Sequence, residues 1–208
     1  MSVIGIFSGT FCREEPVLRE LQKRIGYEIV LDKDIVKRAS ALSGVSTGKI
    51  ERVFSAKTSV FNNFTHEKER SIADLKLAVA ETLLEGNVII FGFSSQLVPR
   101  KVTHVLRVCL IADMKFRKAA AMEALNQSEK EATSLLHKQD GDCAAWVNSH
   151  LATKDPWDAS LYDMVIPTDK TDVEKAVSTI DEYLKKDLLQ PTDASEKAMR
   201  DFLLAASV

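Results

Sequence analysis

Five short, mostly apolar segments alternate along the chain with longer stretches in which apolar residues recur at helical spacing. We predict strands at Val3–Phe7, Glu28–Leu31, Asn87–Gly92, Val105–Ile111 and Tyr162–Ile166. Several of these segments are continuous apolar runs, which are typical of parallel strands covered by helices on both faces. The alternation therefore predicts an α/β fold in which right-handed crossovers build one doubly wound, five-stranded parallel sheet.

Helices between the strands are indicated by periodic apolar residues and by capping signals. Apolar side chains recur every three or four residues from Ile72 to Leu83, which predicts a long helix from about Thr65 to Glu85 that Gly86 ends. The S/T-x-x-E capping box occurs twice, from Ser128 to Glu131 and from Thr171 to Glu174. We expect a helix to begin at each.

Two of the connections are too long for simple crossovers. About 55 residues separate the second and third strands, and about 50 separate the fourth and fifth. Because both stretches have helical or polar patterns, we expect two helical lid-type insertions at the strand ends. We expect residues 1–188 to form this domain and residues 189–208 to form a C-terminal amphipathic helix, from Asp193 to Val208, that leads to a further domain or a partner.

The composition argues against several classes of function. With a formal net charge of -2, the chain has no global positive field to attract nucleic acid or an anionic membrane. No apolar run approaches the roughly 20 residues that span a bilayer. The three cysteines are too scattered for a disulfide framework, and the four histidines lack metal-ligand spacing. We therefore expect a cytoplasmic protein with no dedicated metal site, no nucleic-acid contact and no membrane contact.

The first strand, the loop after it and the next helix have a layout that can hold a phosphate. Backbone N–H groups and a helix N-terminus bind anions in such a layout. The alternative is an ordinary strand-to-helix turn, because Glu14 and Glu15 suit the same helix N-terminus and would repel a triphosphate. The cysteine of the loop is either a low-pKa thiol or a small buried residue. The loop residues are Ser8, Gly9, Thr10, Phe11, Cys12 and Arg13.

Several segments, in the same order along the chain, resemble the cytidylate kinase-like family of P-loop nucleoside monophosphate kinases from about Val3 to Tyr183. The resemblance implies a P-loop kinase-like fold that uses ATP and Mg²⁺, with a nucleotide as its partner. Besides the loop, the segments are Leu31–Val36, Ala39–Gly44, Asn87–Gly92, Val105–Asp113 with Arg117, Ser128–Ala132, Asp140 and Asp155–Asp163.

The chain departs from the family pattern where positive charge is needed. The family loop resembles Gly-Ser-Gly-Gly-Arg, whereas this chain has Gly9-Thr10-Phe11-Cys12-Arg13. Its cysteine lies about where related loops have a phosphate-binding lysine. Phe93 follows Gly92 where the family often has arginine, Cys143 stands at the position of a lid arginine, and Pro167 stands where an asparagine is expected.

The resemblance assigns catalytic roles to three residues. Arg13 and the loop amides would hold the donor phosphates, Arg117 would supply charge from the lid, and Asp140 would organise the lid. Each has a structural alternative: a solvated helix start for Arg13, a charged surface for Arg117, and the end of a helix for Asp140.

Four residues are candidates for the acceptor site. The resemblance implies that Asp32 binds the acceptor sugar or base, beside Gly92 at the end of the central strand, and Arg70 could reach the acceptor phosphate. Arg100 follows the central strand, where open α/β sheets bind ligands, and could substitute for the arginine missing at position 93. The structural alternatives are a helix cap for Asp32, an exposed salt-bridged face for Arg70, and a solvated loop tip for Arg100.

Two functions from different classes follow. The order of the motifs favours an ATP-dependent kinase that phosphorylates CMP or a related nucleoside monophosphate. The missing cations favour a catalytically degenerate nucleotide-binding or regulatory module without turnover, because charge neutralisation dominates phosphoryl transfer.

Overall fold

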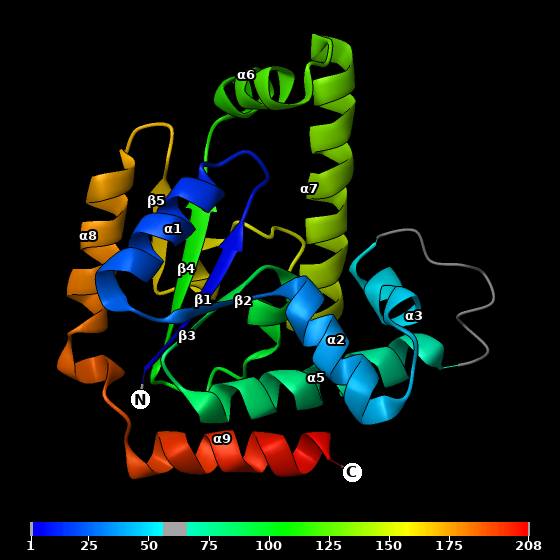
Figure 1. The fold of residues 1–208 in the computed structure, drawn as a ribbon, viewed down its shortest axis with the longest axis vertical. Helices are drawn as coiled ribbons and strands as arrows, with labels where there is room; N and C mark the ends of the chain where they lie inside the picture. Colours follow the sequence, from blue (N-terminus) through cyan, green and yellow to red (C-terminus); the bar gives the residue numbers. More distant parts are fainter. Residues whose placement is uncertain (1, 56–65, 208) are drawn as a thin grey trace.

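A single parallel sheet organises the part of the chain that the computed structural model describes, which is residues 2–55 and 66–207. The strand order is β2-β3-β1-β4-β5, and every neighbouring pair is parallel, as the sequence predicts. Figure 1 shows helices on both faces of this sheet. The strands are β1 (Val3–Ser8), β2 (Glu28–Leu31), β3 (Val88–Phe91), β4 (Val105–Ile111) and β5 (Met164–Pro167).

Some strand ends differ from the predicted ones by one residue, and two strand starts differ for local reasons. Asn87 has a left-handed φ of 52°, so β3 begins only at Val88. Tyr162 ends a short 3₁₀-helix, η3 (Ala159–Leu161), and its hydroxyl donates to the carbonyl of Pro156. The last strand therefore begins at Met164 rather than at Tyr162.

The alternation of side chains along β1 divides the core into two layers. Ile4 and Ile6 pack with α1 (Glu14–Ile25) and α8 (Val173–Leu184) on one face. Val3 and Phe7 belong to the core on the other face. That face is covered by α2 (Asp32–Ser43), α5 (Glu67–Glu85), α7 (Glu129–Leu151) and α9 (Asp193–Ala206), as Figure 1 shows.

The described parts of both long connections are mainly helical, as expected. The first contains α2, α3 (Thr47–Glu51), η1 (Arg52–Phe54) and α5, and the second contains α6 (Met114–Leu125) and α7. Between β3 and β4 the chain forms η2 (Phe93–Leu97). Helix α5 begins at Glu67, and Thr65, where we expected its start, lies outside the described residues.

One of the two capping boxes is confirmed. The hydroxyl of Ser128 accepts from the Glu131 amide, and the Glu131 carboxylate accepts from the Ser128 amide. The prediction for Thr171 is wrong: Asp172 caps α8 by accepting from the Lys175 amide. An aspartate one position later competes successfully because its carboxylate is a better acceptor at a helix N-terminus.

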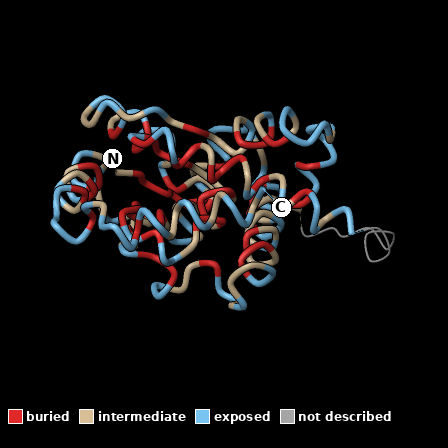
Figure 2. Tube along the Cα trace, turned by 90° about the horizontal axis from the view of Figure 1, so that it is seen from below, coloured by how far each residue is buried: buried red, intermediate tan, exposed pale blue. Residues whose placement is uncertain are grey.

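The C-terminal helix packs on the domain. Helix α9 lies along α5, and its Ala198, Met199 and Phe202 contact the core. Figure 2 shows the buried stretches gathered in the interior and the exposed ones on the outer helices. Among the described residues, no helix combines the length and the apolar character that crossing a membrane requires.

Candidate functional site

The loop Ser8–Arg13 lies at the carboxyl ends of the strands, where open α/β sheets bind their ligands (Figure 1). The Gly9 amide donates to the carbonyl of Leu110, which fixes the loop to β4. Phe11 and Arg13 have left-handed φ angles of 61° and 56°. Glycine adopts this conformation without strain, whereas this loop adopts it at two residues with large side chains.

The chain supplies its own anion to this loop. The carboxylate of Glu14 accepts from the Phe11 amide at 3.1 Å with one oxygen and from the Cys12 amide at 2.8 Å with the other. These N–H groups are the donors that the loop would otherwise offer to a phosphate. Glu14 therefore satisfies with a carboxylate the anion preference of a turn at a helix N-terminus.

The arginine of the loop points elsewhere. The guanidinium carbon of Arg13 lies 4.8 Å from the ring centroid of Phe116 on α6, a cation–π geometry. The structure thus brings Ser8, Gly9, Thr10, Phe11 and Cys12 together around the turn, while the Arg13 side chain stacks on α6.

Arg117 and Asp140 join the loop to both helices of the second insertion. Arg117 is buried, and its two terminal nitrogens lie 2.7 and 3.0 Å from the two carboxylate oxygens of Asp140. Its Nε donates to the Thr10 carbonyl at 2.8 Å. Burial alone would lower the pKa of Arg117, but the hydrogen bond and charge of Asp140 outweigh it, so the pKa is raised. The carboxylate of Asp140, which binds both terminal nitrogens of Arg117, therefore already neutralises the charge of this arginine.

Thr10 is held by the same helices. Its hydroxyl donates to Oε1 of Gln139 at 2.7 Å. Sequence reasoning missed Gln139, although it directly precedes Asp140, because no motif marked its amide as a partner of the loop.

Cys12 is a buried packing residue rather than a reactive thiol. Burial raises its pKa to about 12, and the nearby Arg117 offsets only part of that effect. A thiol with such a pKa carries almost no thiolate at neutral pH, so it is a poor nucleophile.

Asp32 contacts the segment that follows Gly92, which sequence reasoning did not anticipate. Asp32 is the first residue of α2, yet its half-buried carboxylate accepts from the amides of Phe93 and Ser94, both at 2.8 Å. It therefore caps η2, and Asp34 accepts from the Leu31 amide at the start of α2 instead. Burial raises the pKa of Asp32, opposed by these hydrogen bonds.

The two arginines predicted for the acceptor site lie away from the loop. Arg70 is exposed on α5, and Arg100 donates to the carbonyl of Ser160. Neither lines the cavity beside the loop. Their roles in an acceptor site stay predictions.

A cavity of about 480 Å³ opens beside the loop and is predominantly acidic. Glu14, Asp32, Glu51 and Asp142 line it, whereas Lys138 is the one basic side chain among its described lining residues. Its apolar wall contains the stacked rings of Phe54 and Phe93, whose centroids are 5.2 Å apart. Sequence reasoning missed Phe54 and Lys138, which no motif singled out.

As arranged, these residues do not fit ATP with Mg²⁺. The loop amides of Phe11 and Cys12 are occupied by Glu14, the loop has no lysine, and the cavity wall carries more carboxylates than cations. Within residues 2–55 and 66–207, no three His, Cys, Asp or Glu side chains are grouped to hold a metal ion. A polyphosphate would meet repulsion where a phosphate-binding loop normally supplies attraction.

Comparisons with known proteins agree with the fold. The model of the cytidylate kinase-like family matches residues 3–170. An uncharacterised protein from Eubacterium ventriosum is similar in structure, with a TM-score of 0.65 and 18% identity over 88% of this chain and 97% of that one.

A shikimate kinase from Bacteroides thetaiotaomicron shares the fold more distantly. The TM-score is 0.50 and the identity 7%, over 89% of this chain and 99% of that one. The comparison with curated proteins found no match.

Proposed function

Because the chain belongs to the cytidylate kinase-like family, we propose that it is a nucleotide-kinase-like domain that no longer transfers phosphoryl groups. The observation that carries this proposal is the carboxylate of Glu14 on the amides of Phe11 and Cys12. A built-in anion at this place keeps the loop folded without a nucleotide and opposes the entry of a polyphosphate.

The cations of the site support the same proposal. Phosphoryl transfer depends on positive groups that neutralise the charge developing on the transferred phosphate. Arg117 is committed to Asp140 and to the Thr10 carbonyl, and Arg13 stacks on Phe116. As arranged, neither guanidinium is free to contact a phosphate during its transfer. In this proposal Arg117 and Asp140 position the loop and do not act as catalytic residues.

The same geometry allows the domain to bind a nucleotide, in competition with the carboxylate of Glu14. A nucleotide would enter the cavity against the rings of Phe54 and Phe93, and its phosphates would have to displace Glu14 from the loop amides. We therefore expect weak nucleotide binding in the unmodified chain and strong dependence on the charge at position 14.

The competing function is ATP-dependent phosphorylation of CMP or a related nucleoside monophosphate. The family match over residues 3–170 favours it, as does the position of Arg117 beside the loop. In that case Glu14 and Asp140 would have to release the loop amides and Arg117 when ATP and Mg²⁺ bind.

Replacing Glu14 by glutamine tests the proposal directly. We expect Glu14→Gln to tighten the binding of ADP with Mg²⁺ at least about tenfold, because a like charge about 4 Å from a phosphate costs several kcal/mol at an intermediate dielectric constant. Isothermal titration calorimetry measures the dissociation constants. Glu15→Gln is the matched control, since Glu15 is the exposed neighbour of Glu14 and pairs with Arg19.

A turnover assay separates the two functions. ADP release coupled to a panel of nucleoside monophosphates should show no turnover by the unmodified chain. Turnover above about 1 s⁻¹, the low end for kinases, would contradict the proposal. Equal affinities of the unmodified chain and Glu14→Gln for ADP would show that the loop does not face phosphate.

A further inference from the structure

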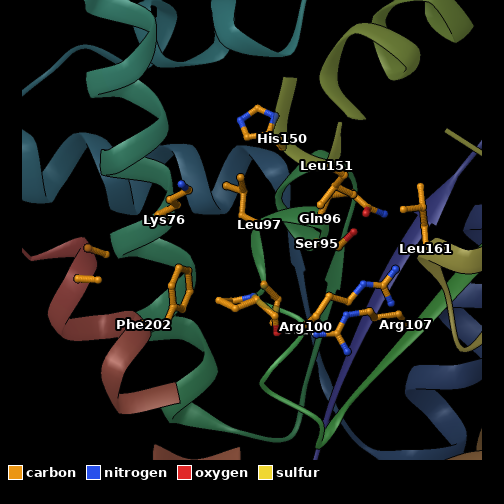
Figure 3. Close-up of a pocket in the computed structure, with 14 residues that line it drawn as sticks. Lys76, Ser95, Gln96, Leu97, Arg100, Arg107, His150, Leu151, Leu161 and Phe202 are labelled. Atoms are coloured by element: carbon orange, nitrogen blue, oxygen red, sulfur yellow. Dashed lines mark hydrogen bonds between the residues drawn. The ribbon is translucent and has the colours of Figure 1, made fainter. Parts of the chain in front are cut away.

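A second cavity, of about 330 Å³, lies away from the loop, on the face of the sheet that carries α5, α7 and α9 (Figure 3). It lies between the chain that follows η2, the C-terminal end of α7 and the last turns of α9. Its volume is at the small end of the roughly 300–1,000 Å³ typical of ligand sites. None of the residues that line it lines the cavity beside the loop.

The walls of this second cavity combine an apolar surface with positive charge. Leu97, Leu151, Leu161 and Phe202 contribute apolar side chains from four different elements or their ends. The titratable side chains are all basic, with no aspartate or glutamate among the described lining residues. They are Lys76, Arg100, Arg107 and His150.

The lysine and the two arginines of the cavity, Lys76, Arg100 and Arg107, form no salt bridge with a described carboxylate. Asp163 lies near Arg107, but its carboxylate accepts from the backbone amide of that residue. Lys76 and Arg100 are exposed, whereas Arg107 is half-buried. An unpaired, partly desolvated cation such as Arg107 is unfavourable, and an anion beside it offsets that cost.

Arg107 is the clearest case. Its guanidinium donates to the carbonyl oxygens of Val105, Pro99 and Val102, all of which are neutral. Burial lowers the pKa of Arg107 to about 10; the charge of Asp163 opposes this effect and that of Arg100 adds to it. Figure 3 shows the two guanidinium groups close together on one side of the cavity, with Lys76 and Phe202 on the other side.

His150 adds an unused polar atom. Its Nδ1 lies 2.8 Å from the Trp146 carbonyl and 2.7 Å from the Ser149 hydroxyl. The carbonyl can only accept, so a hydrogen bond to it requires the proton on Nδ1. Its Nε2 is buried and has no hydrogen-bond partner among the described residues. Buried polar atoms without partners are rare, and a ligand in this cavity would provide one.

We propose that this cavity is a binding site for a small organic anion with an apolar body. The charged group, a carboxylate or a phosphate monoester, lies against Arg100 and Arg107, and the apolar body packs on Leu97 and Phe202. This inference is independent of the proposed function, because the loop cavity is lined mainly by acidic side chains and the second cavity by basic ones.

Titration of the full chain with four probes tests this site. The probes are benzoate, phenyl phosphate, inorganic phosphate and uncharged benzyl alcohol, with affinity measured by calorimetry and location by amide chemical shifts. We expect one or both aromatic anions to bind more tightly than inorganic phosphate and than benzyl alcohol, with shifts at Leu97 and Phe202. The better of the two anions tells a carboxylate ligand from a phosphate ligand.

A charge substitution with a matched control makes the test specific. Arg100→Gln should weaken the better aromatic anion at least about tenfold, as expected for a lost hydrogen bond to a charged group. Lys101→Gln removes the same charge from the adjacent exposed residue, which does not line the cavity, and should change the affinity less than twofold. Excess ADP should not displace the bound anion.

Three results would overturn the proposal. One is equal weakening by Arg100→Gln and Lys101→Gln, which would indicate general surface attraction. Another is chemical-shift changes confined to Gly9–Cys12, which would place the anion at the loop. The third is that inorganic phosphate or benzyl alcohol binds as tightly as both aromatic anions, because the cavity would then not require both a charge and an apolar body.

Discussion

Gly92 has a φ of 110°, and a Cβ at this position would lie 2.1 Å from Oδ2 of Asp32. The half-buried Asp32 carboxylate accepts from two amides of η2, so moving it away would break both hydrogen bonds. We expect Gly92→Ala to lower the free energy of unfolding by at least about 2 kcal/mol, from backbone strain and displacement of Asp32 together. Urea unfolding monitored by circular dichroism measures this change.

Gly141 offers the matched control for that substitution. It lies in α7, and a Cβ at this position would have no neighbouring atom within 4 Å, so alanine meets open space there. We expect Gly141→Ala to raise stability by about 0.5–1 kcal/mol, because alanine loses less backbone entropy in a helix. Equal effects of the two substitutions would show that the Asp32 contact does not restrict Gly92.

Single residues could be predicted from the sequence only where a local pattern marked them. The turn after β1 and the conflict between Glu14 and a triphosphate follow from adjacent residues. The contact of Asp32 with Phe93 and Ser94 joins residues about 60 positions apart, and the pairing of Arg117 with Asp140 crosses between two helices. Such contacts depend on the packed fold, which no spacing along the chain reveals.

At the scale of elements, the strands were predictable because continuous apolar runs have few alternatives in an α/β chain. The ends of the strands were less predictable. Asn87 and Tyr162 lie in turns, and the hydrophobic pattern does not distinguish these turns from strand residues. The docking of α9 was also not predictable. An amphipathic pattern shows that a helix has an apolar face, but it does not show which element that face packs against. Only the structure shows that α9 packs on α5.

Ser195 anchors the start of α9 to the rest of the domain. Its buried hydroxyl accepts from the amides of Thr103 and His104, at 3.1 and 3.3 Å. We expect Ser195→Ala to lower the free energy of unfolding by about 1–3 kcal/mol, because it leaves the buried His104 amide without an acceptor. Chemical denaturation measures the loss, and Ser207→Ala, at the exposed end of α9, is the control. An equal loss for both would contradict an anchoring role.

At the scale of the whole molecule, two cavities of opposite charge lie on one domain. The acidic one is where the family fold places a phosphate-binding loop, and the basic one is built partly from α9. The family match ends at residue 170, so α9 lies outside it. The sequence predicted the first location from the turn after β1. It could not predict the second, whose basic residues come from four separate segments.

Acidification should destabilise the whole domain through His104 and His150. Burial lowers the pKa of both histidines. The charge of Glu196 opposes this effect at His104, and the hydrogen bond to the Trp146 carbonyl opposes it at His150. Since their folded-state pKa values lie below the unfolded value of about 6.5, the unfolded chain takes up protons first as the pH falls through that value.

We therefore expect the free energy of unfolding to be smaller at pH 5.5 than at pH 7.5, and the decrease to be smaller in a His104→Gln/His150→Gln double variant. Urea denaturation at the two pH values measures both decreases. Burial raises the pKa of Asp32, so its protonation favours the folded state as the pH falls. Because Asp32 is present in both the unmodified chain and the double variant, its effect cancels when their stability losses are compared. His137→Gln, an exposed substitution on α7, is the control. If the double variant lost as much stability between pH 7.5 and pH 5.5 as the unmodified chain, His104 and His150 would not be the cause of the acid destabilisation.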